Sequence, residues 1–150
     1  MATKTKNQLI EQEKAYIAGF FDGEGCVEIS RNHHRANPQL FLRIIVSNTY
    51  KPIIDWLYAI YGGTTHFRKQ QANWRSCWHW RISARKAEIF LRDIYPYSKI
   101  KKEQIKLAFE FIETIKSKGR NNLTQEVKTK REQLKSQISG FKYFDYGGIN

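Results

Sequence analysis

The segment that most constrains this chain is an apolar helix whose small residues share one face and whose end carries a carboxylate between two glycines. It spans Tyr16–Gly25 and reads YIAGFFDGEG. Residues three or four apart lie on the same side of a helix, and here that side comprises Ala15, Ala18, Gly19, Asp22 and Gly23. Each glycine inside a helix costs roughly 1 kcal/mol relative to alanine. The sequence therefore predicts that a second backbone packs closely on this face.

Two partners fit such a face. One is another element of the same chain, which would make the segment a tight internal crossing followed by a turn into a strand. The other is the same helix from a second copy, which would bring two Glu24 side chains together at the negative ends of two helices. A divalent cation relieves the repulsion among carboxylates and carbonyls gathered in this way. The spacing alone is compatible with both.

Positive charge is concentrated in the middle of the chain. The formal net charge is +12, and between Ile29 and Ala87 ten lysines and arginines accompany a single acid, Asp55. This segment therefore carries nine of the twelve net charges. Charges that serve solubility alone are normally mixed in sign. The clustering favours a polyanionic partner, most simply a nucleic acid.

The composition is typical of one globular domain over residues 1–150, with 41% hydrophobic residues. We expect the core at about 8–118 and a C-terminal helix and tail at 123–150. No apolar run approaches the ~20 residues of a membrane span, and Met1–Glu13 contains no apolar signal-peptide segment. The two cysteines share no metal-ligand spacing with the four histidines. These features predict an intracellular protein without a structural zinc site or a membrane partner.

Hydrophobic periodicity predicts the order helix, two strands, helix, two strands, helices, which is an α+β fold with a four-stranded antiparallel sheet. We expect helices at about 8–23, 52–61, 85–94, 100–119 and 123–138, and strands at about 26–32, 39–47, 64–68 and 74–83. Turns are expected at 32–38 and 70–73. Residues 139–150 show no pattern that predicts a structure.

One face of the predicted sheet is apolar, and the other carries mostly polar and cationic side chains. The two kinds alternate along each strand with a period of two. The second face holds Glu28, Ser30, Asn32, Gln39, Phe41, Arg43, His66, Arg68, Arg75, His79 and Arg81. A twisted β-ribbon can enter the major groove of DNA, where arginine recognises guanine and asparagine or glutamine recognises adenine. This set predicts contacts to DNA bases or phosphates.

Residues Ile17–Gly25 resemble the signature motif of the LAGLIDADG homing endonucleases. The predicted order of elements is also that of the family, and the resemblance extends over about Ala15–Ile115. A single motif in 150 residues is similar to the intron-encoded, homodimeric branch and not to the two-motif monomers. The resemblance implies an αββαββα fold whose saddle-shaped, four-stranded antiparallel sheet is covered by helices on one face.

The resemblance also implies roles for individual residues. Glu24 matches the acidic position of the motif that binds catalytic metal, with glutamate where aspartate is common, and the Gly23 carbonyl matches a main-chain ligand. Asn48 falls where a glutamine orients solvent. Lys101 falls where a lysine flanks the active centre, although Lys99 and Lys102 are adjacent candidates. Lys51 or Pro52 fills a position that carries a basic residue in similar enzymes. The dimer interface implied by the motif comprises Ala15, Ala18, Gly19, Asp22 and Gly23.

The function implied by this resemblance is site-specific hydrolysis of both strands of a long pseudo-palindromic DNA target. The implied cofactor is Mg²⁺, with Mn²⁺ or Ca²⁺ able to substitute for binding. Phosphodiester hydrolysis needs cations that polarise the phosphoryl group and activate water, and a two-fold dimer supplies one site per strand. The sequence is compatible with two locations. One is an organelle, either a chloroplast or a mitochondrion, and the other is a prokaryotic cytoplasm.

Other functions remain compatible with the sequence. An RNA maturase that binds group I intron RNA, or a DNA-binding protein that does not cleave, could use the same fold, although the acid at position 24 favours cleavage. The basic C-terminal helix, with Lys128, Lys130, Arg131 and Lys135, is a candidate contact for RNA or flanking DNA. A basic protein that binds nucleic acid without specificity is disfavoured by the varied side chains on the strand faces.

Overall fold

The computed structural model describes residues 9–33, 36, 38–69, 71–73, 75–116 and 123–147, with side chains described as far as Phe141. In chain order the elements are α1 (Glu11–Glu24), β1 (Gly25–Arg31), β2 (Leu40–Asn48), α2 (Lys51–Tyr61), β3 (Thr64–Arg68), β4 (Cys77–Ser83), α3 (Ala84–Ile94), α4 (Lys102–Lys116) and α5 (Gln125–Gly147). The predicted α+β order of elements is confirmed. The expected strand start at Trp74 and helix end at Gly119 lie outside the described residues.

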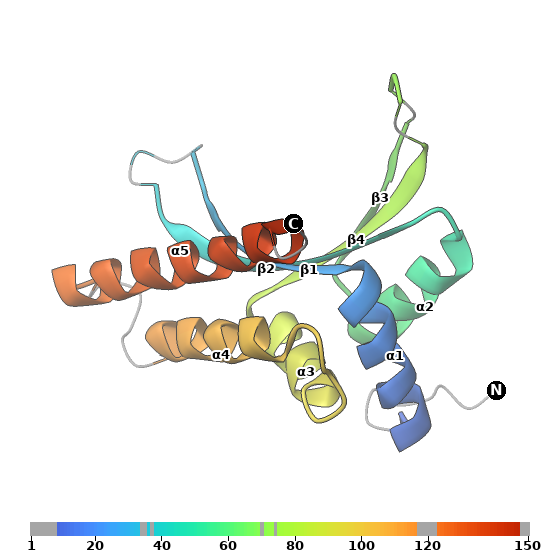
Figure 1. Ribbon diagram of the computed structural model, residues 1–150, viewed down its shortest axis with the longest axis horizontal. Helices are drawn as coiled ribbons and strands as arrows, with labels where there is room; N and C mark the ends of the chain where they lie inside the picture. The colour runs from blue at the N-terminus through green and yellow to red at the C-terminus, as the bar shows by residue number, and fades with distance from the viewer. Residues whose placement is uncertain are drawn as a thin grey trace.

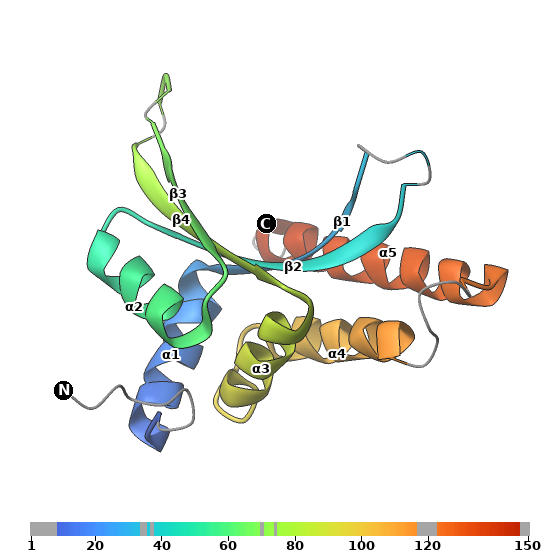
Figure 2. The ribbon, with the colours of Figure 1, turned by 180° about the vertical axis from the view of Figure 1, so that it is seen from behind.

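The four strands form one open antiparallel sheet in the order β1-β2-β4-β3. Each hairpin is paired in register, with Glu28 opposite Arg43 in the first and His66 opposite His79 in the second. The hairpins join along β2 and β4, where Val46 lies opposite Trp80. The sheet is concave, and the two hairpin tips rise on either side of its surface (Figures 1 and 2).

The helices cover the convex face of the sheet, where they form the core. The described buried apolar residues make one cluster that includes the central strand side chains Ile44, Trp80 and Ile82. Phe90 of α3 packs edge-on against Trp80 and Phe21. Alternation along the strands directs these side chains inward and their neighbours to the concave face. The four-stranded sheet covered by helices on one face is as expected from the sequence.

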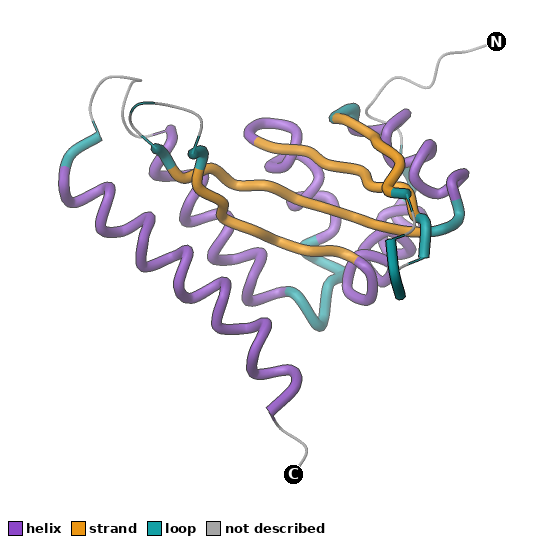
Figure 3. The backbone as a smooth tube through the Cα atoms, turned by 90° about the horizontal axis from the view of Figure 1, so that it is seen from above, coloured by secondary structure: helices purple, strands orange, loops and turns teal. Residues whose placement is uncertain are grey.

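Helix α5 is longer than its periodicity indicates, ending at Gly147 rather than Ile138. It lies along α4 and the edge strand β1, away from α1 (Figure 3). Leu134 and Ile138 are fully buried against the core, and Arg31 of β1 pairs with Glu132. The helix therefore covers the outer edge of the sheet. None of the helices in the described part of the chain has the length and apolar composition of a transmembrane span.

Candidate active site and nucleic-acid interface

The acidic end of the signature segment lies where α1 passes directly into β1. Gly23 and Glu24 are exposed in the last turn of the helix, and Gly25 begins the strand with extended backbone. A Cβ atom at Gly25 would overlap the ring of Phe21, which explains why a glycine is needed at this abrupt change of direction. The turn places the exposed residues Gly23 and Glu24 directly before the start of β1.

Asp22, one turn before this end, is a buried structural residue. Its carboxylate accepts hydrogen bonds from the hydroxyl of Ser98 at 2.5 Å and from the backbone N–H groups of Lys99, Ile100 and Lys101 at 2.7, 3.1 and 3.2 Å. These N–H groups precede the first turn of α4, and such groups have no partner within a helix. Asp22 therefore caps α4 from α1 and ties together two segments 77 residues apart.

The hydrogen bonds decide the charge of this buried acid. Burial by itself raises the pKa of Asp22, but the N–H of Lys99, the Ser98 hydroxyl and the N–H groups of Ile100 and Lys101 together outweigh it. The net pKa lies below the ordinary value of 3.8. Asp22 is therefore ionised at neutral pH, and its negative charge faces the positive end of α4.

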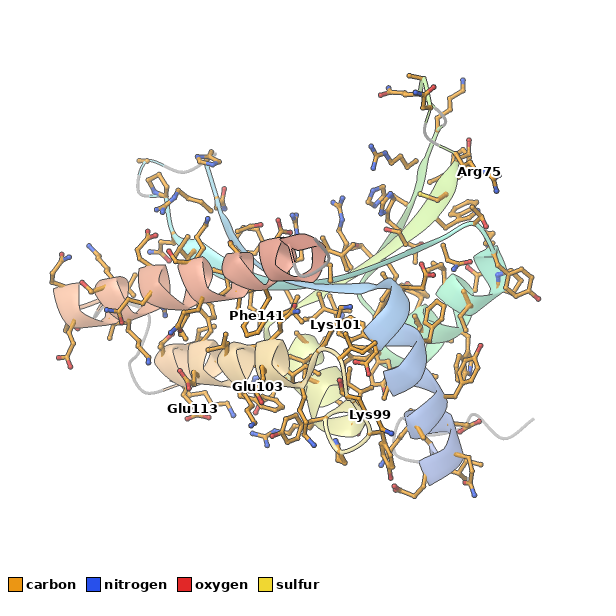
Figure 4. All side chains as sticks on the ribbon, in the orientation of Figure 1. Arg75, Lys99, Lys101, Glu103, Glu113 and Phe141 are labelled. Carbon is orange, nitrogen blue, oxygen red and sulfur yellow. The ribbon has the colours of Figure 1, made fainter. Side chains whose placement is uncertain are left out.

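Of the three adjacent lysines, the structure brings only Lys101 to the end of α1. Its ammonium donates a hydrogen bond to the backbone carbonyl of Asp22 at 2.6 Å, so it lies next to Gly23 and Glu24. Figure 4 shows Lys101 beside the α1–β1 junction and Lys99 lower, by the α3–α4 connection. The ammonium of Lys102 instead lies 5.0 Å from the ring centre of Tyr95.

Asn48 comes to the same place by sheet pairing. Gly25 lies opposite Val46, so Asn48, two residues further along β2, lies beside the last residues of α1. Its Oδ1 accepts the backbone N–H of Tyr50 at 2.8 Å, which leaves the amide NH₂ for a ligand. The ammonium of Lys51 is directed elsewhere, 2.7 Å from the Asp55 carboxylate.

The small-residue face of α1 is open. Ala15, Gly19 and Gly23 are exposed, and a Cβ atom at either glycine would have no neighbour within 4 Å apart from its own helix. No other described element of the chain packs on Gly19 or Gly23, as the alternative of an internal helix crossing would require. Ala18 and Asp22, which we grouped with this face, are 0% and 8% exposed. They pack inside their own protomer because the helix turns them toward α3 and α4, and they offer little surface to a second copy.

The eleven side chains expected to contact DNA lie on the concave face or at the hairpin ends. Glu28, Ser30, Phe41 and Arg43 belong to the concave side of the first hairpin, and a backbone hydrogen bond from Asn32 to Gln39 closes its described end. The second hairpin contributes His66, Arg68, His79 and Arg81. Arg75 is exposed near the tip of that hairpin (Figure 4).

Some of these side chains are paired with one another, which the sequence pattern does not reveal. Nε and Nη2 of Arg43 donate to one carboxylate oxygen of Glu28 at 3.0 and 2.6 Å. The guanidinium carbon of Arg43 also lies 5.8 Å from the ring centre of Phe41. Because Glu28 lies directly opposite Arg43 in the sheet, the pair forms from neighbouring strands. Arg43 reaches a ligand as part of this pair and not as an isolated cation.

Two histidines stack at the centre of the second hairpin, with ring centres 4.8 Å apart. His79 is nearly buried, and its Nδ1 lies 2.5 Å from the hydroxyl oxygen of Ser47 on β2. Burial, followed by the positive charge of Arg81, lowers the pKa of His66. Burial, the neighbouring His66 and the charges of Arg81 and Arg68 lower that of His79. Both rings are neutral at neutral pH, and both nitrogens of His79 are engaged, Nδ1 with Ser47 and Nε2 with Sγ of Cys77 at 3.5 Å.

The basic residues of α5 do not form one contact surface. Arg131 lies inward, where its Nε donates to the hydroxyl of Thr114 at 2.9 Å and its Nη2 donates to the Thr114 carbonyl at 3.2 Å. Lys130 pairs with Glu110 of α4 at 3.3 Å. These two cations hold α5 on α4, which corrects the expectation that all four basic residues are available to nucleic acid. Lys128 is exposed, and Lys135 is partly buried.

The end of α1 offers oxygen ligands to a metal ion. In the described part of the chain, no three acidic, histidine or cysteine side chains are placed to share a metal ion. One protomer offers the Glu24 carboxylate and the carbonyl of Gly23. These hard oxygen donors fit Mg²⁺, which keeps several waters and completes its shell with phosphate oxygens. The donor set of one protomer is thus compatible with Mg²⁺ but does not fill its coordination shell.

No protein-family profile and no curated protein sequence matches this chain. Solved structures do match. The homing endonuclease I-CvuI in complex with its target in the presence of Ca has a TM-score of 0.71 at 19% identity, covering 87% of this chain and 82% of that chain. The archaeal intron-encoded homing endonuclease I-Vdi141I complexed with DNA has a TM-score of 0.74 at 16% identity, covering 93% and 90%.

Larger proteins match over part of their length. The LAGLIDADG meganuclease I-AabMI bound to uncleaved DNA has a TM-score of 0.62 at 20% identity, over 81% of this chain but 43% of that chain. Identities this low establish likeness of fold. The matched region makes up most of the I-CvuI and I-Vdi141I chains. It makes up less than half of the I-AabMI chain.

Proposed function

We propose that this chain, which has the fold of the LAGLIDADG homing endonucleases, is a metal-dependent endonuclease that cuts both strands of a specific DNA site as a homodimer. The observation that carries the proposal is the convergence at the end of α1. An exposed carboxylate, a carbonyl, an ammonium and an amide lie there at the margin of a concave, cationic sheet face. The complexes of I-CvuI and I-Vdi141I with DNA support DNA as the partner.

Each residue at this end has a part in the proposed reaction. Glu24 and the Gly23 carbonyl would hold Mg²⁺, and the bound ion would supply polarisation of the scissile phosphate and activation of a water molecule. The ammonium of Lys101, fixed by its bond to the Asp22 carbonyl, stabilises negative charge that develops on the phosphate. The amide of Asn48 orients a water molecule. The Asp22 carboxylate positions Lys101 by accepting a hydrogen bond from the backbone N–H of Lys101.

The open face of α1 supports a homodimer. Two copies joined through Ala15, Gly19 and Gly23 bring two Glu24 carboxylates near one two-fold axis, so that each protomer supplies one cleavage site. A single protomer presents only one concave surface, which suits one half of a pseudo-palindromic target.

We expect Gly19→Leu to convert the dimer to a folded monomer. Leucine at this position has space in the protomer, where a Cβ atom meets nothing within 4 Å, but its side chain would hold two closely packed helices apart. Light scattering at micromolar concentration checks the mass, and circular dichroism checks folding. Gly140→Leu is the matched control, since Gly140 is also a helical glycine with no neighbour within 4 Å. A monomeric wild-type protein would contradict the proposal.

We expect the positive charge of Lys101 to increase the rate of DNA cleavage, in addition to any effect of its hydrogen bond to the Asp22 carbonyl. Lys101→Gln keeps a donor on a shorter side chain and removes the charge, whereas Lys101→Met removes both. Both variants should cleave about 100-fold more slowly with unchanged DNA affinity, because charge stabilisation acts in the transition state. Single-turnover cleavage and a binding isotherm in Ca²⁺ make the comparison. If Lys101→Gln cleaves normally and only Lys101→Met is slow, the ammonium serves as a cap for α1.

The overall proposal is tested by selecting cleaved sequences from a randomised duplex library in Mg²⁺. We expect one long, nearly palindromic sequence to be enriched, with cuts in both strands. Binding without cleavage at every divalent ion would indicate a DNA-binding protein on this fold. Binding to structured RNA in preference to any duplex would indicate a maturase.

A further inference from the structure

A cleft opens on the concave face where β4 ends. The last residue of β4, Ser83, pairs with Arg43 of β2, while β3 begins to pair with β4 only at Thr64 opposite Arg81. Beyond this point the chain leaves the sheet as α3, between β2 and the start of β3 (Figure 2). The resulting cleft has a volume of about 640 Å³. It lies at the opposite end of β4 from the hairpin tip.

Four cationic side chains line this cleft. Arg43 and Arg81 come from the sheet, and Arg85 and Lys86 come from the first turn of α3, together with the hydroxyl groups of Thr64 and Ser83. The neighbouring carboxylate of Glu28 is already bound by Arg43. Within the described residues, neither Arg81, Arg85 nor Lys86 makes a salt bridge or a side-chain hydrogen bond. Three cations therefore lie in one place without a salt bridge to another described residue.

Arg81 is the least satisfied of these cations. Its Nε is buried and is the one buried side-chain nitrogen or oxygen atom without a hydrogen-bond partner in the described part of the chain. A buried donor without an acceptor costs free energy of folding. Burial and the charge of Arg43 lower the pKa of the Arg81 guanidinium, whereas Glu28 raises it. The free protein thus holds a buried N–H group of Arg81 without an acceptor, next to other cations.

We propose that this cleft binds one backbone phosphate of the DNA, with Arg81 at its floor and Arg85 and Lys86 at its rim. The inference rests on the proposed function. A phosphate fits because the group must accept several charge-assisted hydrogen bonds at once, whereas a base edge presents a mixture of donors and acceptors. Arg81 therefore anchors the duplex without regard to sequence, which is the phosphate-contacting role among the two expected of its face.

The test compares Arg81→Met with Arg92→Met, a matched loss of one arginine outside the cleft, where Arg92 is exposed on α3 and pairs with Glu88. Binding is measured in Ca²⁺ from 50 to 300 mM KCl, on the duplex selected by cleavage and on a scrambled duplex. Arg81→Met should bind both about tenfold more weakly, and the slope of log affinity against log salt should fall by about one. Arg92→Met should bind like the wild type.

A scan of single methylphosphonate linkages then identifies the phosphate. One neutral linkage per half-site should weaken binding by the wild type and leave binding by Arg81→Met unchanged. An altered preference at one base pair with an unchanged salt slope would overturn the inference and make Arg81 a base reader. A wild type that binds no duplex at all would instead overturn the proposed function, and with it this inference.

Thermal unfolding of the free protein gives an independent measurement. Methionine has a similar length but no buried donor, so Arg81→Met should raise the melting temperature by about 2–4 °C. Arg92→Met should leave it unchanged or slightly lower. A lower melting temperature for Arg81→Met would show that the guanidinium stabilises the fold, contrary to the inference.

Discussion

Replacement of Glu24 by glutamine should abolish DNA cleavage in Mg²⁺ while leaving DNA binding intact. The amide is a poorer metal ligand than the carboxylate, and loss of several kcal/mol of transition-state stabilisation corresponds to at least about a thousandfold in rate. The melting temperature should stay equal or rise, because Glu24 is exposed in the protomer and would lie near its symmetry mate in the dimer. Single-turnover cleavage, binding in Ca²⁺ and thermal unfolding measure the three quantities.

Glu24→Asp is the control for this substitution. It keeps the charge with one methylene less, so it should retain a measurable part of the cleavage activity. In wild-type protein, Ca²⁺ should support binding with little cutting, because it accepts looser oxygen geometry than Mg²⁺. Normal cleavage by Glu24→Gln would show that the exposed acid is only the last residue of a helix and would remove the basis of the proposed mechanism.

The second large effect is expected at Asp22. Asp22→Ala leaves the Ser98 hydroxyl and three backbone N–H groups without their acceptor. With about 1–3 kcal/mol for each buried donor and some access for water, the free energy of unfolding should fall by about 3–5 kcal/mol. Asp55→Ala is the control, because Asp55 makes only an exposed ion pair with Lys51 and should change stability by less than about 1 kcal/mol.

The pH dependence of stability separates charge from shape at Asp22. Its folded pKa is lowered, so the unfolded chain binds the proton more readily, and the stabilising contribution is present above the ordinary value of 3.8. That contribution is lost as the pH falls through the folded pKa. Urea unfolding should be measured for the wild type and for Asp22→Asn between pH 6 and pH 2. The difference between their free energies of unfolding should become smaller below pH 4. If the difference in the free energy of unfolding stayed constant over this pH range, the charge of the Asp22 carboxylate would not contribute to stability.

Most of the fold could be predicted from alternation and turn residues. The period of two along the strands correctly separated Leu42 and Ile44 from Phe41 and Arg43, and Gly62-Gly63 correctly marked the end of α2. Helix α5 was predicted too short. The residues beyond Ile138 include Gly140 and four aromatic residues, which have a lower helix propensity than alanine or leucine, and they show no helical pattern of hydrophobicity.

The positions of the candidate site residues could be predicted only where local structure fixes them. Glu24, Gly23 and Asn48 lie together because helix end and strand pairing fix them locally. Asp22 was misassigned because its partners, Ser98 to Lys101, are distant in the sequence. Spacing alone likewise could not distinguish Lys101 from Lys99 and Lys102, since the choice depends on which ammonium reaches the Asp22 carbonyl.

The alternation along the strands separates the requirements of stability from those of recognition. Side chains such as Ser30 and His66 can be exchanged without opening a void in the core, because their neighbours on the other face carry the packing. Under the proposed function, a lineage could therefore follow a drifting DNA target by single substitutions that leave the fold intact. Glu28 and Arg43 are an exception, because their ion pair makes each substitution depend on the other. At that position, a new target sequence would require two coordinated mutations.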